Sequence, residues 1–522
     1  MTIWREHLPA LLLALPLLGA FAAPVAGHFG SRARNVWFVS ITALTALVAW
    51  GLWQQVSASG IVVYVMGAEH SRLTLPSGMA LPVRILLEVD AMSALMAFMG
   101  AIAALAGALF SVRSMERFSG LDQFVALYLL LTAGMLGMEI TGDLFNFFVF
   151  LEIASVASCG LVAFWRDRPE AVEASFKYML LSTVGALMVL VAVAFFYGRY
   201  NTVAMAGVAS HLQLGLAEKA ALVFLVSALA MKCGTVPMHM WTPDAYAEAP
   251  AGVTCLLVAV SQAALYGLFR VCFTLYGASL GSSAVAWALI IMGLLSMFIG
   301  VTMAVIQKDV KRLMAYHSVS QVGYMLLGMG VALLVLSDPQ KMAAYGAMAL
   351  QGAVYHLFNY TMYKGLLFLV AGALAYAAGS RNLNDLGGLG RRMPQTAALF
   401  VIAAAAIAGL PPFNGFVSKL MIYESSFAVH PLLPVVAMVT SMLTLASFVK
   451  VFQTAFLGPE KAALREVQEV PGFMRGGMAL LAVVVLVLSL FPTWSVGSFV
   501  EPAARALMDR AAYVGAVLGG GL

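Results

Sequence analysis

The chain has 522 residues, of which 62% are hydrophobic and only 10% are charged, with a formal net charge of +5. A soluble domain carries about 25% charged residues, so this composition, with a mean hydropathy of +0.93, excludes a water-soluble fold and indicates a protein solvated by lipid. The basic residues are scattered and form no run, which argues against a nucleic-acid partner.

A transmembrane helix needs about 20 consecutive apolar residues, and segments of this kind predict an all-α polytopic membrane protein of about fourteen helices. The segments centre near residues 17, 45, 100, 130, 155, 187, 228, 262, 295, 325, 362, 407, 444 and 485. The first is expected to be a helix and not a signal peptide, because Glu6 offsets Arg5 and another span follows. The only long polar loop is expected between Ser57 and Glu88.

The distribution of lysine and arginine predicts the orientation, because short cytoplasmic loops are the basic ones. Loops after the odd-numbered helices hold most of these residues. The few in loops after even-numbered helices are Arg72, Arg84, Arg199, Lys219, Arg270 and Lys341. We therefore expect the odd-numbered loops in the cytoplasm and both termini outside, in the inner membrane of a bacterial or archaeal cell.

Four lysines lie inside or at the edge of apolar segments, namely Lys232, Lys364, Lys419 and Lys450. A lysine at the bilayer centre costs at least about 2.5 kcal/mol, and such residues mostly mark ion pathways. Glu152 is a lone carboxylate in the apolar segment LFNFFVFLEIASVASCGLVAF. A buried carboxylate and amine that lie together can share or exchange a proton. A structural ion pair between two helices is the alternative.

Prolines are expected to interrupt two of the helices. Pro237 follows Lys232, and in GLPPFNGFVSK the pair Pro411 and Pro412 precedes Lys419. Proline removes a backbone hydrogen bond and frees carbonyl groups, which membrane proteins tolerate where protein or water satisfies them. Broken helices in matching positions of two halves indicate the binding site of an inverted-repeat transporter. Two incidental kinks are the alternative.

Two histidines are further candidates for proton transfer. His356 and Lys364 are eight residues apart in YHLFNYTMYKGLLF, so they share one face of a helix. Histidine titrates close to neutral pH and relays protons readily. His317, in KDVKRLMAYHSVSQVGY, has less support, because a lone histidine in a helix is more often a satisfied polar group.

Five segments together resemble a known family. They are, in chain order, TGDLFNFFVFLEI, KCGTVPMHMWTPDAYAEAP, KDVKRLMAYHSVSQVGY, HLFNYTMYKGLLFL and GLPPFNGFVSK. This set resembles the antiporter-like subunits shared by Mrp cation/proton antiporters, membrane-bound hydrogenases and respiratory complex I, and within that family it resembles the D-type subunits of Mrp antiporters most. The resemblance implies two inverted five-helix repeats, formed by helices 4–8 and 9–13, in which helices 7 and 12 are broken. The implied division is 1–120 for helices 1–3, 121–275 and 276–457 for the two repeats, and 458–522 for helix 14 and a short tail.

The resemblance also implies roles for individual residues. Glu152 and Lys232 match the glutamate of helix 5 and the lysine of helix 7, whose pairing gates proton uptake. His356 and Lys364 match relay positions of helix 11, and Lys419 matches the lysine of helix 12 that exchanges protons with the far side of the membrane.

The chain departs from the family pattern at two positions. The family usually has a lysine in helix 8, where this chain has Gln262, and a second histidine in helix 11, where it has Tyr360. Glutamine orients water but holds no charge, so the central relay is weakened. Ser261, Gln262 and Tyr266 could instead hold a chain of water molecules, because each offers donors and acceptors.

We therefore expect a subunit that translocates protons or sodium ions within a multisubunit membrane complex, with other membrane subunits and the lipid bilayer as partners. No metal or cofactor is expected, since the chain has no CxxC, HExxH, P-loop or dinucleotide motif. Two alternatives remain open. One is an ion-pumping module of a complex I-like redox enzyme, with the electron chemistry in partner subunits. The other is a scaffold whose conduction is impaired by Gln262.

Overall fold

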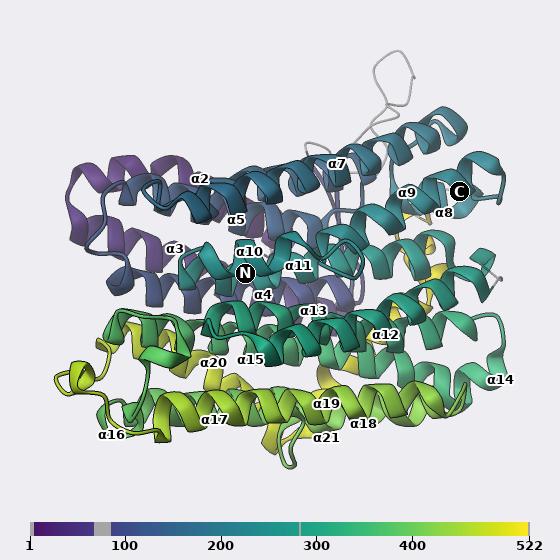
Figure 1. Cartoon of the computed structure of the whole chain (residues 1–522). Coiled ribbons are helices and arrows are strands. Elements are labelled where there is room, and N and C mark those ends of the chain that lie inside the picture. The colour runs from purple at the N-terminus through teal and green to yellow at the C-terminus, as the bar shows by residue number, and fades with distance from the viewer. Residues whose placement is uncertain (1–4, 67–84, 281–282, 520–522) are drawn as a thin grey trace.

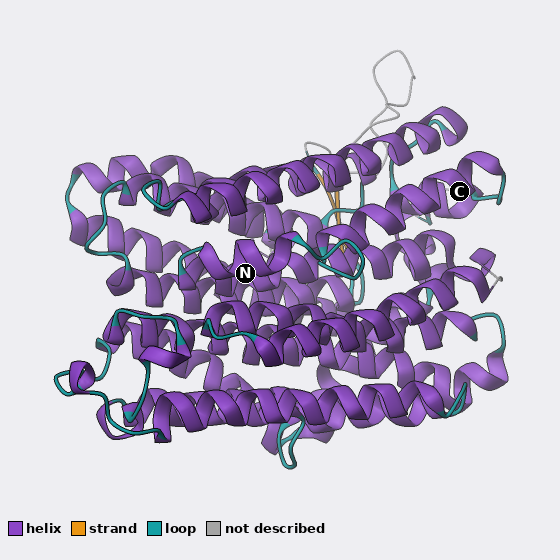
Figure 2. Ribbon diagram, in the orientation of Figure 1, coloured by secondary structure: helices purple, strands orange, loops and turns teal. Residues whose placement is uncertain are grey.

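The computed structural model describes residues 5–66, 85–280 and 283–519. These residues form a bundle of helices that lie side by side, with their axes roughly horizontal in Figure 1. The two short strands β1 (Val62–Val65) and β2 (Leu86–Val89) are the orange elements among the helices of Figure 2. The predicted all-α polytopic fold is confirmed. Arg72 and Arg84, which contributed to the predicted orientation, lie outside the described residues.

Twelve helices in the described ranges are long and apolar enough to cross a membrane. They are α2 (Leu8–His28), α3 (Ser31–Ser59), α4 (Ala91–Ser114), α5 (Leu121–Ile140), α6 (Leu144–Val162), α7 (Pro169–Tyr200), α11 (Ala251–Phe269), α12 (Ser283–Ile306), α13 (Val310–Leu334), α15 (Ala347–Ala378), α19 (Leu432–Val451) and α20 (Gly472–Leu490). Three of them, α11, α15 and α19, are extended by the short segments given below. The predicted count of fourteen and the inverted repeats stay predictions.

Both interruptions that the prolines predict are present. The seventh predicted helix is divided into α9 (Leu216–Lys232) and α10 (Trp241–Glu248). The twelfth is divided into α17 (Pro394–Ala408) and α18 (Asn414–Phe427). The halves have 17, 8, 15 and 14 residues, below the about 20 residues of a typical spanning helix, so two halves together make up each span.

Short segments connect or extend these helices. They are α8 (Met205–His211), η1 (Arg270–Tyr276), η2 (Gly277–Leu280), α14 (Pro339–Lys341), η3 (Met342–Gly346), η4 (Leu383–Asp385), α16 (Leu389–Arg392), η5 (Phe452–Leu457), η6 (Ala462–Leu464), α21 (Pro492–Ser495), η7 (Val496–Val500), α22 (Glu501–Met508) and α23 (Arg510–Leu518). The segments η1, η3, η5 and η7 are π-helical, and η2, η4 and η6 are 3₁₀-helical.

Six of the seven predicted site residues are buried within the bundle, and Glu152 is partly exposed. The apolar window of α11 is 100% buried and that of α13 is 94% buried, whereas that of α7 is only 39% buried. The outer helices expose large apolar side chains such as Phe176, Leu187 and Phe298. Such surfaces are stable against lipid but not against water, so the central helices α11, α13 and α15 are shielded by an outer ring.

The region that the sequence predicted as one long polar loop contains a small hairpin. The strands β1 and β2 pair antiparallel, with Val62 opposite Val89. Their β-branched and aromatic residues favour extended backbone, and β2 is fully buried beneath the adjoining helices.

Two basic residues are buried, and the sequence analysis had assigned the first of them, Arg270, to a loop. Arg270 lies in η1, and Lys311 lies in the first turn of α13; each has only 2% of its surface exposed. Both have partners that make burial possible, because Arg270 forms an ion pair with Asp90 and Lys311 donates a hydrogen bond to the carbonyl of Ala249.

Candidate functional site

Lys232 is the last residue of α9 and has 7% of its surface exposed. Its ammonium group donates a hydrogen bond of 2.5 Å to the hydroxyl of Ser155 on α6. Glu152 lies three residues before Ser155 on the same helix and is partly exposed at the surface of the bundle. Among the described residues, the lysine therefore reaches the helix of the predicted carboxylate through a serine and not through a direct ion pair.

A cavity of about 20 Å³ adjoins this lysine. Its lining includes hydroxyl-bearing residues from three helices, which are Ser155 of α6, Tyr178 of α7 and Ser261 of α11. A volume of this size holds about one water molecule, and a buried water needs two to four polar partners. The cavity can therefore extend hydrogen bonding from the end of α9 to the central helix α11.

The chain break after α9 is stabilised by side chains. The backbone turns at Gly234, whose φ is 76°. The indole of Trp241 donates to the carbonyl of Met231 over 2.8 Å, and the hydroxyl of Thr235 donates to the carbonyl of Ala230 over 2.9 Å. These contacts satisfy carbonyls that would otherwise be unpaired at membrane depth, and they fix the position of the adjoining lysine.

Gln262 is fully buried on α11. Its amide nitrogen donates to the hydroxyl of Ser261 over 3.4 Å, and its Oε1 has no hydrogen-bond partner among the described residues. The hydroxyl of Tyr266 instead lies 2.9 Å from the hydroxyl of Ser93 and accepts a bond of 2.9 Å from Arg270. Ser261 thus lines the cavity beside α9 and accepts the bond from Gln262, whereas Tyr266 belongs to a different cluster.

Lys364 is fully buried on α15. Its Nζ has no hydrogen-bond partner in the described chain and lies 5.4 Å from the ring centroid of Phe368. An unpaired ammonium group in the interior costs several kcal/mol. This side chain is therefore well suited to give its proton to a neighbouring acceptor or to water.

His356, two turns earlier on α15, is also fully buried. Its Nδ1 lies 3.0 Å from the hydroxyl of Ser418, and its Nε2 lies 3.2 Å from Oε1 of Gln321 and 3.4 Å from the hydroxyl of Tyr363. With the proton on Nε2, the ring donates to the glutamine and accepts from the serine. Both ring nitrogens are thus joined to groups that can pass a proton.

Lys419 lies on α18 at the second chain break. Its ammonium group donates to the carbonyl of Ile407 over 2.8 Å and to the hydroxyl of Ser441 over 2.9 Å. Ser441 in turn donates to the carbonyl of Ala408 over 2.9 Å. The two carbonyls belong to the last turn of α17, where a helix leaves its carbonyl groups without partners. The break therefore supplies the acceptors that hold the lysine.

The aromatic ring of Tyr324 lies between Lys419 and His356. Nζ of Lys419 lies 4.8 Å from the ring centroid of Tyr324 on α13, and the imidazole of His356 lies 5.3 Å from the same ring. Ser418, the hydrogen-bond partner of His356, directly precedes Lys419. The structure thus brings these two predicted residues together, from helices α15 and α18.

Comparison with known proteins places this arrangement in a family. Residues 141–444 match the family model described as NADH:quinone oxidoreductase/Mrp antiporter, TM. The match covers more than half of the chain. The chain belongs to this family.

Individual relatives agree with this assignment. The N subunit of the NADH-quinone oxidoreductase of Desulforudis audaxviator is 32% identical, over 93% of this chain and 94% of that protein. The D-type subunit of the Na(+)/H(+) antiporter of Alkalihalophilus pseudofirmus is 29% identical, over 97% and 99% of the two chains. A chain in the structure of the Mrp complex from Dietzia sp. superposes with a TM-score of 0.87 at 27% identity, covering 99% of this chain and 100% of that one.

All seven predicted site residues of this NADH:quinone oxidoreductase/Mrp antiporter family member lie within the matched stretch, but they form separate groups. His317 on α13 lies 2.9 Å from the hydroxyl of Ser447 on α19, and its ring packs 4.8 Å from that of Phe448. Its Nδ1 has no partner among the described residues. His317 therefore sits between α13 and α19 and makes no hydrogen bond to the group around His356.

Several polar partners in this family member were missed by sequence reasoning. Gln321 and Tyr324 follow His317 by four and seven residues, so helical spacing puts them on one face of α13. That spacing could have found them. Ser155 and Ser441 gave no comparable signal, because a serine in an apolar helix is common and only its tertiary contact with a lysine distinguishes it.

A further buried cluster was not expected. The guanidinium group of Arg270 forms an ion pair with Asp90, donates to Ser93 over 3.0 Å and lies 5.2 Å from the ring centroid of Tyr513 on α23. Burial raises the pKa of the neighbouring Glu88 carboxyl to about 8. This cluster joins α4, η1 and the C-terminal helix, and none of the predicted site residues belongs to it.

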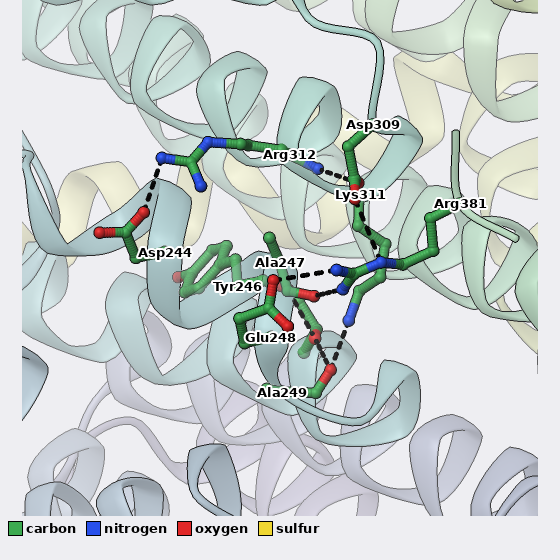
Figure 3. A network of polar contacts seen from close by, with 10 residues as sticks. Asp244, Tyr246, Ala247, Glu248, Ala249, Asp309, Lys311, Arg312 and Arg381 are labelled. Atoms are coloured by element: carbon green, nitrogen blue, oxygen red, sulfur yellow. Dashed lines mark hydrogen bonds and ion pairs between the residues drawn. The ribbon is translucent and has the colours of Figure 1, made fainter. Parts of the chain in front are cut away.

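Another network joins the first broken helix to the second half of the chain (Figure 3). Arg381 lies 2.9 Å from the carboxylate of Glu248 at the end of α10 and 3.1 Å from that of Asp309 just before α13. Lys311 donates to the carbonyl of Ala249. The short helix α10 is therefore fixed against α13 by ionic and backbone contacts.

Proposed function

We propose that this chain is the ion-translocating component of a multisubunit membrane complex, and that protons cross it through Lys232, Lys364 and Lys419. Its family includes both a component of a sodium/proton antiporter and a component of a quinone oxidoreductase. The observation that carries the proposal is Lys364, a fully buried lysine whose Nζ has no partner in the described chain. A structural lysine would be paired, because an unpaired buried charge is costly.

The proposed route begins at Lys232, with Glu152 on the same side as the group that admits the proton. It continues through the small cavity lined by Ser261 to Gln262, and from there by water to Lys364. Hydroxyl groups and water molecules between the lysines donate and accept hydrogen bonds, so they can pass a proton without carrying a permanent charge.

The second half of the proposed route runs from Lys364 to His356 and then to Lys419. Ser418 and Tyr324 support this part. Ser418 contacts His356 and directly precedes Lys419 in the chain, and the ring of Tyr324 contacts both His356 and Lys419. Lys419 delivers the proton to the far side. His317 lies to the side of this path, and we propose that it tunes the local field and is not itself a step.

The test is transport by the whole purified complex in proteoliposomes that contain a pH-sensitive dye. Lys364→Met should lower the rate of proton movement by about 100-fold, the scale of a lost proton-transfer group. The matched control is Lys450→Met, since Lys450 donates to the carbonyls of Val305 and Gln307 at the end of α12 and caps that helix. The control should keep its transport rate per assembled complex. A normal rate in assembled Lys364→Met complex would contradict the proposal.

The driving force is a separate part of the proposal. We propose that cation/proton exchange drives transport, because one relative is named as a subunit of a sodium/proton antiporter. The alternative is a redox-driven pump, which the relative from a quinone oxidoreductase supports. Identification of the co-purifying proteins distinguishes them. Small membrane proteins alone indicate exchange, and iron–sulfur or hydrogenase-like proteins indicate redox coupling.

We also propose that the complex lies in the inner membrane of a bacterial or archaeal cell, with both termini outside. The support is the excess of lysine and arginine in loops after odd-numbered helices. Single cysteines introduced at Arg391 and at Lys341, in loops after an odd- and an even-numbered helix, should react with an impermeant thiol reagent in spheroplasts only at position 341. The reverse pattern would invert the proposed orientation.

A further inference from the structure

A cavity of about 490 Å³ lies apart from the proposed proton route. It opens where the end of α4, the loop between α6 and α7, the start of α13 and the end of α15 meet. Prominent among its lining residues are Arg117, Trp165, Arg168, Lys311, Tyr376 and Arg381. None of the seven predicted site residues lines it. Its loops are among those predicted to be cytoplasmic.

The cavity is rich in positive charge. Four basic side chains line it, against the single carboxylate of Asp309. Two of the four are already engaged, because Arg381 pairs with Asp309 and Lys311 donates to a backbone carbonyl (Figure 3). The remaining two, Arg117 and Arg168, have no carboxylate partner within residues 5–66, 85–280 and 283–519.

Aromatic rings hold these two arginines in place. The guanidinium carbon of Arg168 lies 4.8 Å from the ring centroid of Trp165, and that of Arg117 lies 5.6 Å from that of Tyr376. Neither guanidinium group donates a hydrogen bond to another described residue, so its N–H donors are free. These donors form a planar fork that matches the oxygens of a phosphate group.

The remaining lining favours a ligand that is partly apolar. Phe110 of α4 and Ala375 of α15 also line the cavity, about one turn inside the helix ends. Tryptophan and tyrosine at helix ends are typical of the boundary between lipid and water. Basic pockets between transmembrane helices on the cytoplasmic side bind anionic lipid headgroups, and the volume lies in the range of small-ligand pockets.

We propose that this cavity binds the phosphate group of an anionic phospholipid, with Arg117 and Arg168 as its two charged ligands and Phe110 beneath the glycerol. A soluble phosphate ester has the same recognition chemistry. The apolar side chains inside the cavity favour the lipid as the source, because a soluble ester would gain nothing from them. The site would bind a structural lipid at the junction of the N-terminal helices with both halves of the chain.

The test measures thermal stabilisation of the purified, delipidated complex in detergent. A ligand that binds only the folded state stabilises it by RT ln(1 + L/Kd), where L is the free ligand concentration, so the midpoint of unfolding rises with ligand concentration and with affinity. Dioleoyl phosphatidylglycerol should raise it, and the zwitterionic dioleoyl phosphatidylcholine should not. In the double variant Arg117→Gln/Arg168→Gln, the lipid concentration that gives the same shift should be higher by about tenfold or more, since each lost charged hydrogen bond weakens binding.

The matched control is Arg166→Gln/Arg391→Gln, which removes two exposed arginines that do not line the cavity. It should respond to phosphatidylglycerol as the wild type does. If the double variant fails to assemble, Arg168→Lys replaces it. Lysine keeps the charge but loses the planar fork, so this variant should bind severalfold more weakly.

Three outcomes would overturn the proposal. The first is an unchanged response of the double variant, or an equal loss in the control. The second is an equal stabilising effect of glycerol 3-phosphate, which would identify a soluble ester and not a lipid as the ligand. The third is an acidic segment of a neighbouring protein found in the cavity in a structure of the whole complex. None of these outcomes depends on transport, so the test of the lipid site is independent of the proposed function.

Discussion

The lysines in the interior of this protein differ in how their ammonium groups are held. Lys232 has one serine hydroxyl, Lys419 has a carbonyl and a hydroxyl, and Lys450 has two carbonyls. Lys364 has no hydrogen-bond partner in the described chain. An ammonium group with fixed acceptors is stabilised in place, and one without them is poised for exchange. The number and kind of these acceptors therefore distinguish Lys450, which caps a helix end, from Lys232, Lys364 and Lys419, which are the candidate steps in a proton route.

At Lys419, the alanine and arginine variants distinguish charge from proton exchange. Lys419→Ala should stop transport, because the ammonium group is lost. Lys419→Arg should keep the contacts with Ile407 and Ser441 but also stop transport, since arginine effectively never deprotonates. The measurement is the initial rate of proton movement in proteoliposomes. Full activity of the arginine variant would rule out a proton-exchanging role for this position.

At Gln262, two substitutions test whether water bridges the gap left by the missing lysine. Gln262→Leu should reduce conduction to background, because it removes the polar group next to Ser261 and dries the centre of the route. Gln262→Lys should preserve or raise the rate by adding a charged group there. Unchanged transport in the leucine variant would show that the route avoids this residue. If the wild type itself moves no ions in an otherwise active complex, the scaffold interpretation is correct.

At the scale of elements, the two broken helices place the lysines. In each case the break exposes carbonyl groups at the end of the first half, after α9 and after α17. Side chains then satisfy them, namely Trp241 and Thr235 at the first break and Lys419 and Ser441 at the second. The second break therefore uses Lys419, the proposed proton carrier, as part of its structure, whereas the first break does not use Lys232 in this way.

Gly409 allows the chain to turn at the second break. Its φ is 75°, and a Cβ there would lie 3.0 Å from Cδ of Lys419. Gly409→Ala should therefore lower stability by about 1–2 kcal/mol, the cost of left-handed backbone for a residue with a side chain, and should also reduce transport. The control is Gly476→Ala in α20, where a Cβ meets open space; it should be neutral or slightly stabilising. Thermal unfolding of the purified complex measures both, and equal midpoints for the two variants would contradict the argument.

At the scale of the whole molecule, α10 connects the first broken helix to the second half of the chain. Its carboxyl end is fixed by Arg381, which lies in the loop after α15 and also contacts Asp309 before α13 (Figure 3). A movement of the first break would therefore be transmitted to α13, the helix that carries Gln321 and Tyr324. The contacts give a physical connection between the two groups of site residues.

Removal of that connection should cost stability. Arg381→Met leaves two partly buried carboxylates unpaired and should destabilise the complex by about 1–3 kcal/mol, less than a fully buried pair would, because the arginine side chain is 24% exposed. The control is Arg505→Met, whose pair with Glu501 is exposed on both sides and should contribute less than about 1 kcal/mol. Chemical unfolding of the two variants measures the difference. Equal destabilisation would mean that the network around α10 contributes no more than a surface pair.

Sequence by itself determined the membrane fold, the two interruptions and the set of candidate residues. Runs of apolar residues and isolated lysines are signals that depend only on the cost of charge in lipid. Proline removes a backbone hydrogen bond from any helix interior, although α2 continues through Pro16 and Pro24. Tertiary structure decided which of these residues meet. Only folding brings Ser155 to Lys232, Tyr324 between His356 and Lys419, and Asp90 to Arg270 across 180 residues of chain. Such contacts join helices far apart in sequence, and no local pattern encodes them because each partner is ordinary in its own helix.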